Sequence, residues 1–446
     1  MASMSLSFAK LPMKLIVGAA IAGQAACGWL GESEAPPLPG ERISVLELER
    51  TLEPDPRIAD LKVRLPAPYV NRHWPQAGGY AGHAMHHLSL AEAPKVVWKA
   101  DIGAAADDET RILVSPIVAG GVVYTMDAMS QVSAFDASDG RLFWRVSLQP
   151  EEEEPGEFGG GLAYRGTQLF AATGYGDVFS LDPKTGAQVW RAGLGRPIRS
   201  EPTVSAKSIY VITYDNQLFS LNADDGTTQW NHVGIAEVAG LVGAANAAAE
   251  SDVVVAPYSS GELFAFRSDN GRVLWNDSLI RRRGSTGLSE LSDINGRPVI
   301  DRGRVYAVSH GGRMVAIDIR TGERIWDQNI AGVQSPWIAG DFLFVLTTAN
   351  DLVCLSRREG RIRWVRPLPR YEDEEDREGP IQWLGPVLAG DRLILVSSDA
   401  RAVAISPYTG KMMSELDLPS GATVAPIVAD DTLYVLTKDA QLTAWR

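Results

Sequence analysis

A glycine followed four residues later by a tryptophan recurs along this chain, each time beside a run of alternating apolar residues. The copies are spaced by roughly 40–50 residues, and the sequence between them contains strand patterns and turns without a helical period. They are Gly140–Trp144, Gly186–Trp190, Gly226–Trp230, Gly271–Trp275, Gly322–Trp326 and Gly360–Trp364. A repeat of this length built from strands alone is typical of the blades of a β-propeller.

One copy, residues 115–148, has the pattern of a whole blade. Its β-branched, aromatic and apolar runs predict four strands, and turn residues separate each run from the next. The last turn, Asp136–Gly140, joins an aspartate that accepts local backbone hydrogen bonds to a glycine suited to positive φ. The expected strands are 116–118, 122–125, 132–135 and 141–146.

The same frame predicts further blades downstream and a specific way to close the ring. Residues 426–446 supply only three strands, whereas Lys95–Ile102 has the outer-strand pattern and its own Trp98 but no blade before it. We therefore expect this N-terminal strand to complete the last blade, because closure removes exposed strand edges. The fold class is all-β, an eight-bladed β-propeller of four-stranded blades, with seven blades as the alternative. The intermediate blades are expected at 162–194, 202–233, 253–279, 298–330, 336–368 and 386–418, the last with Ser414 in place of tryptophan.

The repeated tryptophans are interpreted as structural. A tryptophan at a fixed outer-strand position can pack against the neighbouring blade and bury a large apolar area. Repetition in every blade favours packing over ligand binding.

The N-terminus has the features of a bacterial export signal. Lys10 and Lys14 precede the apolar run Leu15–Ala22, and small residues stand just before Cys27. This pattern predicts a lipoprotein that is cleaved and lipidated at Cys27, although Gln24 stands where leucine is usual. The apolar run is too short for a membrane-spanning helix. The predicted parts are a signal peptide (1–26), a lipid-anchored tether with an extended segment (27–93) and the propeller (94–446).

Composition limits the partners of the propeller. The formal net charge of -13 disfavours nucleic acid and anionic lipid as direct partners, so membrane contact is expected only through the lipid anchor. If Cys27 is lipidated, Cys354 is left without a disulfide partner and is expected to be a small buried residue.

The segment before the repeat is rich in proline, glycine and histidine. Residues 66–90 are expected to lie extended over the propeller, with His73, His83, His86 and His87 among them. His83 and His86 are close enough in sequence to share a metal, but no cysteine or paired carboxylate accompanies them. We therefore predict polar histidines and no metal site.

No motif in the chain predicts catalysis. There is no phosphate loop, no GxSxG nucleophile elbow and no HExxH helix, and His232 and His310 are isolated in different blades. Eight blades with an outer-strand tryptophan resemble the quinoprotein alcohol dehydrogenases, whose quinone contacts a vicinal cysteine pair. This chain lacks such a pair, so no cofactor is predicted, and fold alone does not carry function.

A more specific resemblance lies in the longest step between tryptophans. The segment Gly284–Asn295, with the sequence Gly-Ser-Thr-Gly-Leu-Ser-Glu-Leu-Ser-Asp-Ile-Asn, is similar to an inter-blade segment of the BamB family of outer-membrane protein assembly factors. In that family this loop and the preceding inter-blade loop contact the periplasmic POTRA repeats of the barrel-inserting subunit BamA. The resemblance implies partner contacts at Leu241, Asp293 and Asn295, with Asn295 in place of a family acid. Val242 replaces a family arginine, and Arg281–Arg283 is interpreted as a solvated charge cluster.

The resemblance implies a non-catalytic lipoprotein scaffold of the barrel assembly (BAM) complex. It would bind BamA POTRA domains, assist folding and insertion of outer-membrane proteins and contact unfolded outer-membrane chains. Its expected location is the periplasmic face of the outer membrane. Two alternatives remain: a quinoprotein-type oxidoreductase, and a periplasmic ligand-binding propeller with exposed aromatic side chains gathered on one face.

Overall fold

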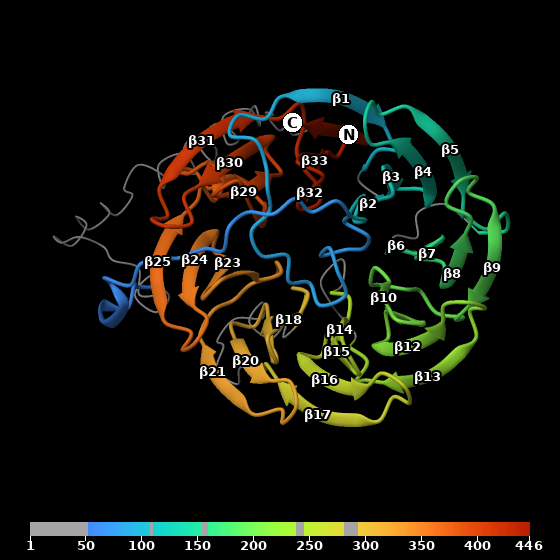
Figure 1. Cartoon of the computed structure of the whole chain (residues 1–446), viewed down its shortest axis with the longest axis horizontal. Coiled ribbons are helices and arrows are strands. Elements are labelled where there is room, and N and C mark those ends of the chain that lie inside the picture. Colours follow the sequence, from blue (N-terminus) through green and yellow to red (C-terminus); the bar gives the residue numbers. More distant parts are fainter. Residues whose placement is uncertain (1–51, 108–109, 154–158, 238–244, 281–292) are drawn as a thin grey trace, which may run out of the picture. The chain divides into compact units, whose positions relative to one another are not determined.

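Eight four-stranded antiparallel sheets surround a common axis (Figure 1), which confirms the predicted eight-bladed propeller. The computed structural model describes residues 52–107, 110–153, 159–237, 245–280 and 293–446, which fall in the compact unit Leu52–Arg446. In these residues no helix is long and apolar enough to cross a membrane.

The blades are numbered in chain order, and the first strand of each lies nearest the axis. Blade 1 comprises β2 (Ile117–Ala119), β3 (Val122–Met126), β4 (Gln131–Asp136) and β5 (Leu142–Ser147). Blade 2 comprises β6 (Gly160–Arg165), β7 (Gln168–Thr173), β8 (Asp177–Leu181) and β9 (Gln188–Gly193). Blade 3 comprises β10 (Thr203–Ser205), β11 (Ser208–Ile212), β12 (Gln217–Asn222) and β13 (Thr228–Val233). Blade 4 comprises β14 (Ala248–Glu250), β15 (Val253–Pro257), β16 (Glu262–Arg267) and β17 (Val273–Ser278).

The second half of the ring repeats this arrangement. Blade 5 comprises β18 (Val299–Asp301), β19 (Arg304–Val308), β20 (Met314–Asp318) and β21 (Arg324–Gln328). Blade 6 comprises β22 (Trp337–Ala339), β23 (Phe342–Leu346), β24 (Asp351–Ser356) and β25 (Ile362–Pro367), and the hairpin of β26 (Tyr371–Asp373) and β27 (Glu378–Pro380) follows it. Blade 7 comprises β28 (Trp383–Ala389), β29 (Arg392–Ser397), β30 (Arg401–Ile405) and β31 (Met412–Asp417). Blade 8 comprises β32 (Ile427–Ala429), β33 (Thr432–Leu436), β34 (Gln441–Trp445) and β1 (Val96–Asp101).

The ring closes as the sequence predicts. The N-terminal strand β1 pairs antiparallel with the last strand β34, with Val96 opposite Trp445. Backbone hydrogen bonds run both ways between Lys95 and Arg446, at 2.5 and 2.9 Å. Two segments at opposite ends of the propeller sequence therefore share one sheet.

The Gly-x-x-x-Trp motif is a contact between neighbouring blades. Gly271 of blade 4 has φ +70° and lies against the indole of Trp230 in blade 3, so close that a Cβ on Gly271 would sit 2.6 Å from that ring. The Trp230 indole N–H donates to the carbonyl of Ser268 at 3.0 Å, in the turn that carries this glycine. The same glycine-on-tryptophan packing joins Gly140 to Trp98, Gly186 to Trp144, Gly226 to Trp190, Gly322 to Trp275, Gly360 to Trp326 and Gly410 to Trp364.

This contact also explains why blade 7 carries Ser414 where a tryptophan is expected. The blade that follows it, blade 8, takes its outer strand from the N-terminus. Blade 8 therefore has no continuous turn between its third and fourth strands, and no glycine to cover a tryptophan of blade 7. Cys354 lies fully buried in β24, where burial raises the pKa of its thiol.

One blade strand was missed in the sequence, as was the β26–β27 hairpin between blades 6 and 7. The pattern predicts that blade 4 begins at Val253, whereas the structure adds β14 (Ala248–Glu250) as its innermost strand. This strand is alanine-rich and carries neither β-branched nor aromatic residues, so it lacks the usual sequence signal of a strand. Small side chains fit a position where strands from all blades converge.

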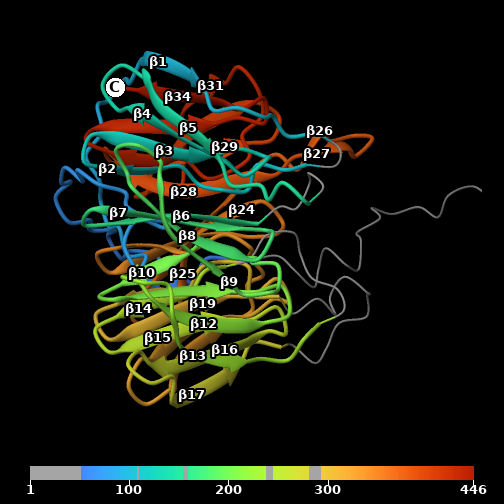
Figure 2. The ribbon, with the colours of Figure 1, turned by 90° about the vertical axis from the view of Figure 1, so that its right-hand side faces the viewer.

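Residues 52–94 lie against the ring before β1 begins. They start beside the outer strand of blade 6, where η1 (Pro56–Ile58) follows a hydrogen bond from the amide of Asp55 to the carbonyl of Ile362 at 2.8 Å. They then cross the middle of the ring as the blue ribbon of Figure 1. We call residues 69–90 the strap and the side of the ring that they cover the strap face. The β26–β27 hairpin lies on the opposite side, the loop face, together with the described parts of the connections between successive blades (Figure 2).

Candidate partner-binding surface

The structure describes only part of the predicted contact set. Cys27, Leu241, Val242 and Arg281–Arg283 lie outside the described residues. Asp293 and Asn295 lie on the loop face, just before the inner strand β18 of blade 5. Contact of these residues with a partner stays a prediction.

Asp293 is held inside the ring. Its side chain is 3% exposed, and its Oδ2 lies 3.3 Å from a guanidinium nitrogen of Arg199, which is 8% exposed. The Arg199 guanidinium also lies over the ring of Tyr214, 5.5 Å from its centre. The pair thus links blade 5 to blade 3, while the side chain of Asn295 is only partly buried.

Because Asp293 is buried, a charge reversal at this position affects stability as well as binding. For a surface contact, as the family resemblance implies at Asp293, Asp293→Lys would weaken partner binding and leave the fold intact. The burial of this ion pair instead predicts that Asp293→Lys destabilises the fold, because the substitution removes one member of a buried pair and places a positive charge against Arg199.

A second, partly buried ion pair joins three blades. Arg297, just before β18, pairs with Glu201, just before β10, and its guanidinium reaches the hydroxyl of Ser115 in blade 1 at 3.5 Å. The other carboxylate oxygen of Glu201 accepts from the amide of Ser115 at 2.8 Å. Together with the Arg199–Asp293 pair, this pair places two positive and two negative charges on the loop face, and their formal charges sum to zero.

Four exposed apolar side chains lie at or just after strand ends of blades 3 and 4. We define the blade 3–4 patch as Tyr214, Val233, Ile235 and Ile280, whose exposed fractions range from 42% to 63%. Val233 and Ile235 stand at the start of the connection from blade 3 to blade 4, and Ile280 at the start of the next connection. The patch therefore flanks both segments in which the family resemblance implies partner contacts. The sequence feature that could have predicted this patch is the presence of apolar residues where outer strands end and those connections begin.

Asn216 ties the backbone at Ile235 to blade 4. Its side-chain amide donates to the carbonyl of Ile235 at 2.6 Å, and its side-chain oxygen accepts from the amide of Ser259 in blade 4 at 3.2 Å. Beneath it, the imidazole of His232 bonds the hydroxyl of Tyr258 at 2.9 Å. A preformed apolar surface needs little ordering when a partner binds, which favours affinity.

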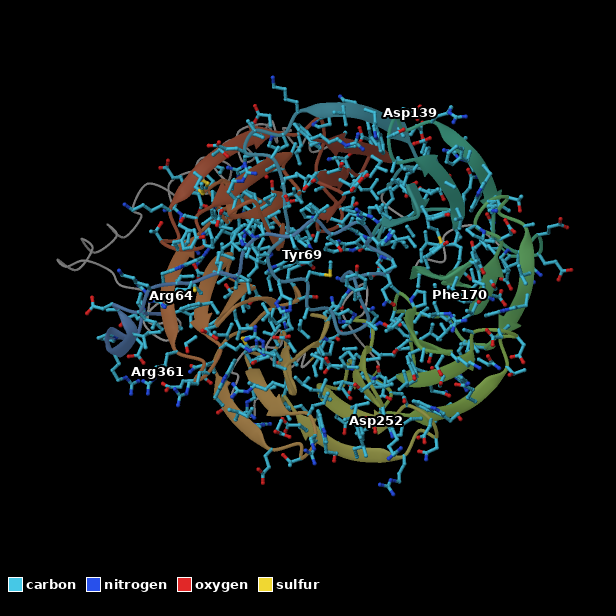
Figure 3. The ribbon with its side chains drawn as sticks, in the orientation of Figure 1. Arg64, Tyr69, Asp139, Phe170, Asp252 and Arg361 are labelled. Carbon is cyan, nitrogen blue, oxygen red and sulfur yellow. The ribbon has the colours of Figure 1, made fainter. Side chains whose placement is uncertain are left out.

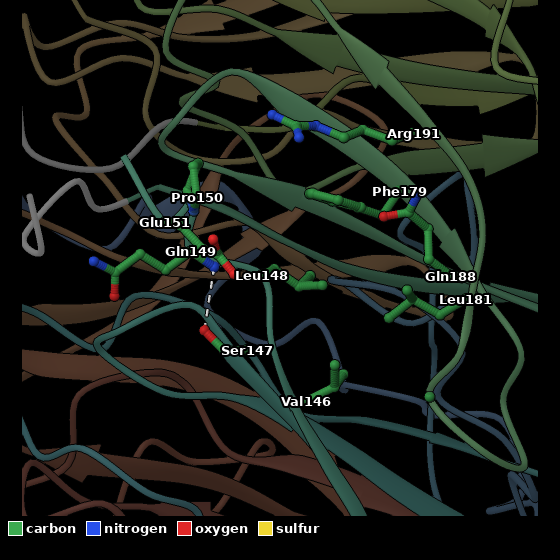
Figure 4. A pocket seen from close by; sticks show the side chains of 11 residues that line it. Val146, Ser147, Leu148, Gln149, Pro150, Glu151, Phe179, Leu181, Gln188 and Arg191 are labelled. Atoms are coloured by element: carbon green, nitrogen blue, oxygen red, sulfur yellow. Dashed lines mark hydrogen bonds between the residues drawn. The ribbon is translucent and has the colours of Figure 1, made fainter. Parts of the chain in front are cut away.

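A small cleft lies elsewhere, between the outer strands of blades 1 and 2 (Figure 4). Its volume is about 250 Å³, below the range usual for small-molecule sites. Arg191 lies over the ring of Phe179 in its wall, 5.6 Å from the ring centre, and pairs with Asp177 at 2.8 Å. This arrangement is a structural ion pair on a strand surface.

The histidines of the strap are bound to the protein individually. Among the described residues, no group of three or more histidine, cysteine or acidic side chains is placed to hold a metal ion. Each ring has its own contact: His73 near the amide of Gly120, His83 with the carbonyl of Pro298, His86 near Asp301, and His87 between the carbonyl of Pro66 and the amide of Asp391.

His83 makes stability depend on pH. Its Nδ1 lies 2.7 Å from the Pro298 carbonyl and its Nε2 lies 3.3 Å from the side-chain nitrogen of Asn246, which fits a neutral ring. Complete burial lowers the pKa of His83 from 6.5 to about 3. Between these values the unfolded chain binds a proton that the folded chain does not. This site therefore lowers the free energy of unfolding as pH falls from 6.5, by about 1.4 kcal/mol per pH unit.

Urea unfolding at pH 7.5, 6.0 and 5.0 measures this dependence. His83→Gln should reduce the slope against pH, whereas His73→Gln, at an exposed strap position, should leave it unchanged. Equal slopes for the protein and His83→Gln would contradict this assignment.

Comparison with known proteins agrees with the resemblance carried by Gly284–Asn295. A family model described as outer membrane protein assembly factor BamB matches residues 87–154, 128–366 and 373–445. The outer membrane protein assembly factor BamB of Shewanella oneidensis is 24% identical over 357 residues, which cover 78% of this chain and 88% of the relative.

Solved structures share the fold. The crystal structure of BamB from Moraxella catarrhalis matches with a TM-score of 0.66 at 19% identity, covering 79% of this chain and 100% of that chain. The quinohemoprotein alcohol dehydrogenase from Comamonas testosteroni matches with a TM-score of 0.61 at 12% identity, covering 84% and 80%. At such identities these structures show the fold alone. The family model, however, matches most of the sequence, and this chain therefore belongs to the BamB family of outer membrane protein assembly factors.

Proposed function

We propose that this protein is a non-catalytic scaffold of the barrel assembly complex of the outer membrane. In this proposal it binds the periplasmic POTRA domains of a BamA-like barrel protein, assists folding and insertion of outer-membrane proteins, and contacts unfolded outer-membrane chains. Its membership of the BamB family supports the assembly role.

The blade 3–4 patch is the single observation that carries the partner site. Exposed apolar groups of this kind, rimmed by polar residues, mark surfaces for other proteins. Here they flank the two connections that contain Leu241, Asp293 and Asn295. We propose that the partner covers Val233 and Ile235 and approaches Asn295 along the same face.

Pairing of the nearby charges supports a binding role over a catalytic one. A general acid or base must exchange a proton with the substrate. The carboxylates of Asp293 and Glu201 instead hold the guanidinium groups of Arg199 and Arg297. This arrangement is suited to fixing the relative positions of blades 1, 3 and 5.

The membrane attachment completes the proposal. Ala25-Ala26-Cys27 supports lipidation at Cys27 and anchoring at the periplasmic face of the outer membrane. Stable anchoring takes more than one acyl chain, because a single chain binds a membrane only marginally. The anchor then keeps the propeller near the barrel protein.

Affinity purification of tagged protein from detergent-solubilised membranes tests the partner site. Val233→Asp places a charge at the patch and should reduce recovery of the barrel protein at least roughly tenfold, since a buried unpaired charge is costly. Val189→Asp is the matched control, because Val189 also lies on an outer strand and is 60% exposed, against 63% for Val233. Equal recovery with both variants, or no barrel protein with any, would contradict the proposal.

A further inference from the structure

The innermost strand of every blade has one free edge that faces the axis of the ring. Unpaired strand edges are sites where another chain can add. In this protein the strap bonds the backbone of the inner strand in seven blades, and in blade 6 it accepts a hydrogen bond from the side chain of the inner-strand residue Trp337. Hydrogen bonds reach blade 8 from Asn71, blade 1 from Trp74, blade 2 from Pro75, blade 3 from Gln76, blade 4 from Ala81, blade 5 from Gly82, blade 6 from His86 and blade 7 from Leu88.

These contacts follow the order of the blades around the ring. The strap starts at blade 8, passes blades 1 to 6 in sequence and finishes at blade 7. Its two ends then join, since the amide of Tyr69 donates to the carbonyl of His87 at 3.1 Å and the amide of Ser89 donates to Tyr69 at 2.8 Å. The strap therefore makes one turn around the axis (Figure 3, where Tyr69 lies near the centre).

The bonded positions are equivalent from blade to blade. In blades 1, 3, 4, 5 and 8 the strap contacts the middle residue of a three-residue inner strand. Those residues are Val118, Val204, Ala249, Ile300 and Val428. The strap therefore bonds an equivalent residue in each of these blades. Its bonding groups have the same spacing as the inner strands, which a loosely attached terminal segment would not show.

Gln76 extends this match with its side chain. Its Oε1 accepts from the amide of Val204 at 2.7 Å, and its Nε2 lies 3.4 Å from the Val204 carbonyl. A side-chain amide carries the same donor and acceptor as a peptide group. The Gln76 side chain thus takes the place of a peptide group beside Val204 in blade 3. The backbone of Gln76 forms a β-bridge with Ala163 in blade 2.

Apolar packing fills the space inside the strap. Trp74 stacks on Trp337 of blade 6 with ring centres 6.4 Å apart, and the Trp337 indole N–H donates to the carbonyl of His86 at 2.7 Å. Met85 and Leu88 are fully buried. These side chains of the strap are therefore packed against the ring.

We propose that residues 71–88 are a built-in peptide ligand of the ring, which fixes the spacing of the eight inner strands and closes the axial channel at the strap face. Binding by strand-edge hydrogen bonds with a few apolar anchors is the chemistry of β-augmentation, here within one chain. The strap then prevents external ligands and partners from entering the axial channel on the strap face. They can reach the channel only from the loop face. This inference stands on contacts within the chain and does not depend on the partner.

Cleavage of the full-length protein tests whether the strap is a ligand. A specific protease site introduced between the exposed residues Glu92 and Ala93 separates the strap from β1 without altering either. The N-terminal piece should co-elute with the ring on gel filtration and leave only on unfolding. In the same cleaved protein, Trp74→Ala should speed its release at least roughly tenfold, since burial of a large aromatic side chain is lost. Separation of the pieces while the ring stays folded would overturn the proposal.

Hydrogen exchange on the uncleaved protein gives a second test. The amides of Val118, Val204, Ala249 and Ile300 should be protected although they lie on edge strands. Gln76→Ala should raise exchange at Val204 roughly tenfold, because its acceptor is lost. Gln168→Ala is the matched control, since that side-chain amide bonds the carbonyl of Ala223 away from the strap. Rapid exchange at these amides in the unmodified protein would contradict the proposal.

Discussion

Gly271→Ala is expected to lower the free energy of unfolding by about 2–4 kcal/mol. A side chain at φ +70° costs about 1 kcal/mol, and overpacking against a buried neighbour adds about 1–3 kcal/mol. The neighbour is Trp230, whose indole would lie 2.6 Å from the new Cβ. Denaturant unfolding of the purified protein measures the loss.

Two further variants isolate the tryptophan contact. Gly303 also has positive φ, at +74°, but a Cβ there meets nothing within 4 Å, so Gly303→Ala should cost only about 1 kcal/mol. In a Trp230→Ala background the effect of Gly271→Ala should fall to that of Gly303→Ala. An unchanged effect in that background would show that the indole is not the cause.

Asp293→Lys is expected to destabilise the protein by about 3–5 kcal/mol, the usual loss when one member of a buried ion pair is removed. The new lysine would face Arg199 in a site where the present carboxylate is 3% exposed. Thermal and denaturant unfolding should both register the change. Asp269→Lys breaks a pair with Arg267 at the surface and should have no measurable effect. Equal stability of the two variants would contradict the buried pair.

This prediction decides how partner experiments are designed. Loss of binding in Asp293→Lys would report unfolding as much as a lost contact. Val233 and Asn295 are the better positions for variants. Val233 is exposed at the start of the connection from blade 3 to blade 4, and Asn295 is partly buried in the connection from blade 4 to blade 5.

Most of the fold could be predicted because its rules are local and repeated. Each blade restates the same strand pattern and turn, and the Gly-x-x-x-Trp motif marks the same contact each time. The closing strand was found because Lys95–Ile102 carries that pattern without a blade before it. The inner strand β14 was missed because Ala248 and Ala249 lack the β-branched or aromatic signal of a strand.

The remaining features depend on distant contacts that leave no periodic signal. Gln76 pairs with Val204 across 128 residues, and a glutamine in a proline- and glycine-rich segment gives no sign of this. In the sequence Asp293 has the pattern of a surface acid. Its partner Arg199 is 94 residues away in sequence, and only the fold brings the two side chains together. The family resemblance implies partner contacts in two connections between blades, which stays a prediction, whereas the burial of Asp293 became visible only in the folded ring.

Site-specific photo-cross-linking in intact cells tests most directly whether the loop face is the partner surface. A photoreactive residue at Val233 on the loop face is compared with one at Tyr80 on the strap, where the side chain is also exposed. Our account predicts a cross-link from Val233 to a BamA-like barrel protein and none from Tyr80 to that protein. Cross-linking of the barrel protein from Tyr80 alone, or from neither position, would contradict the account.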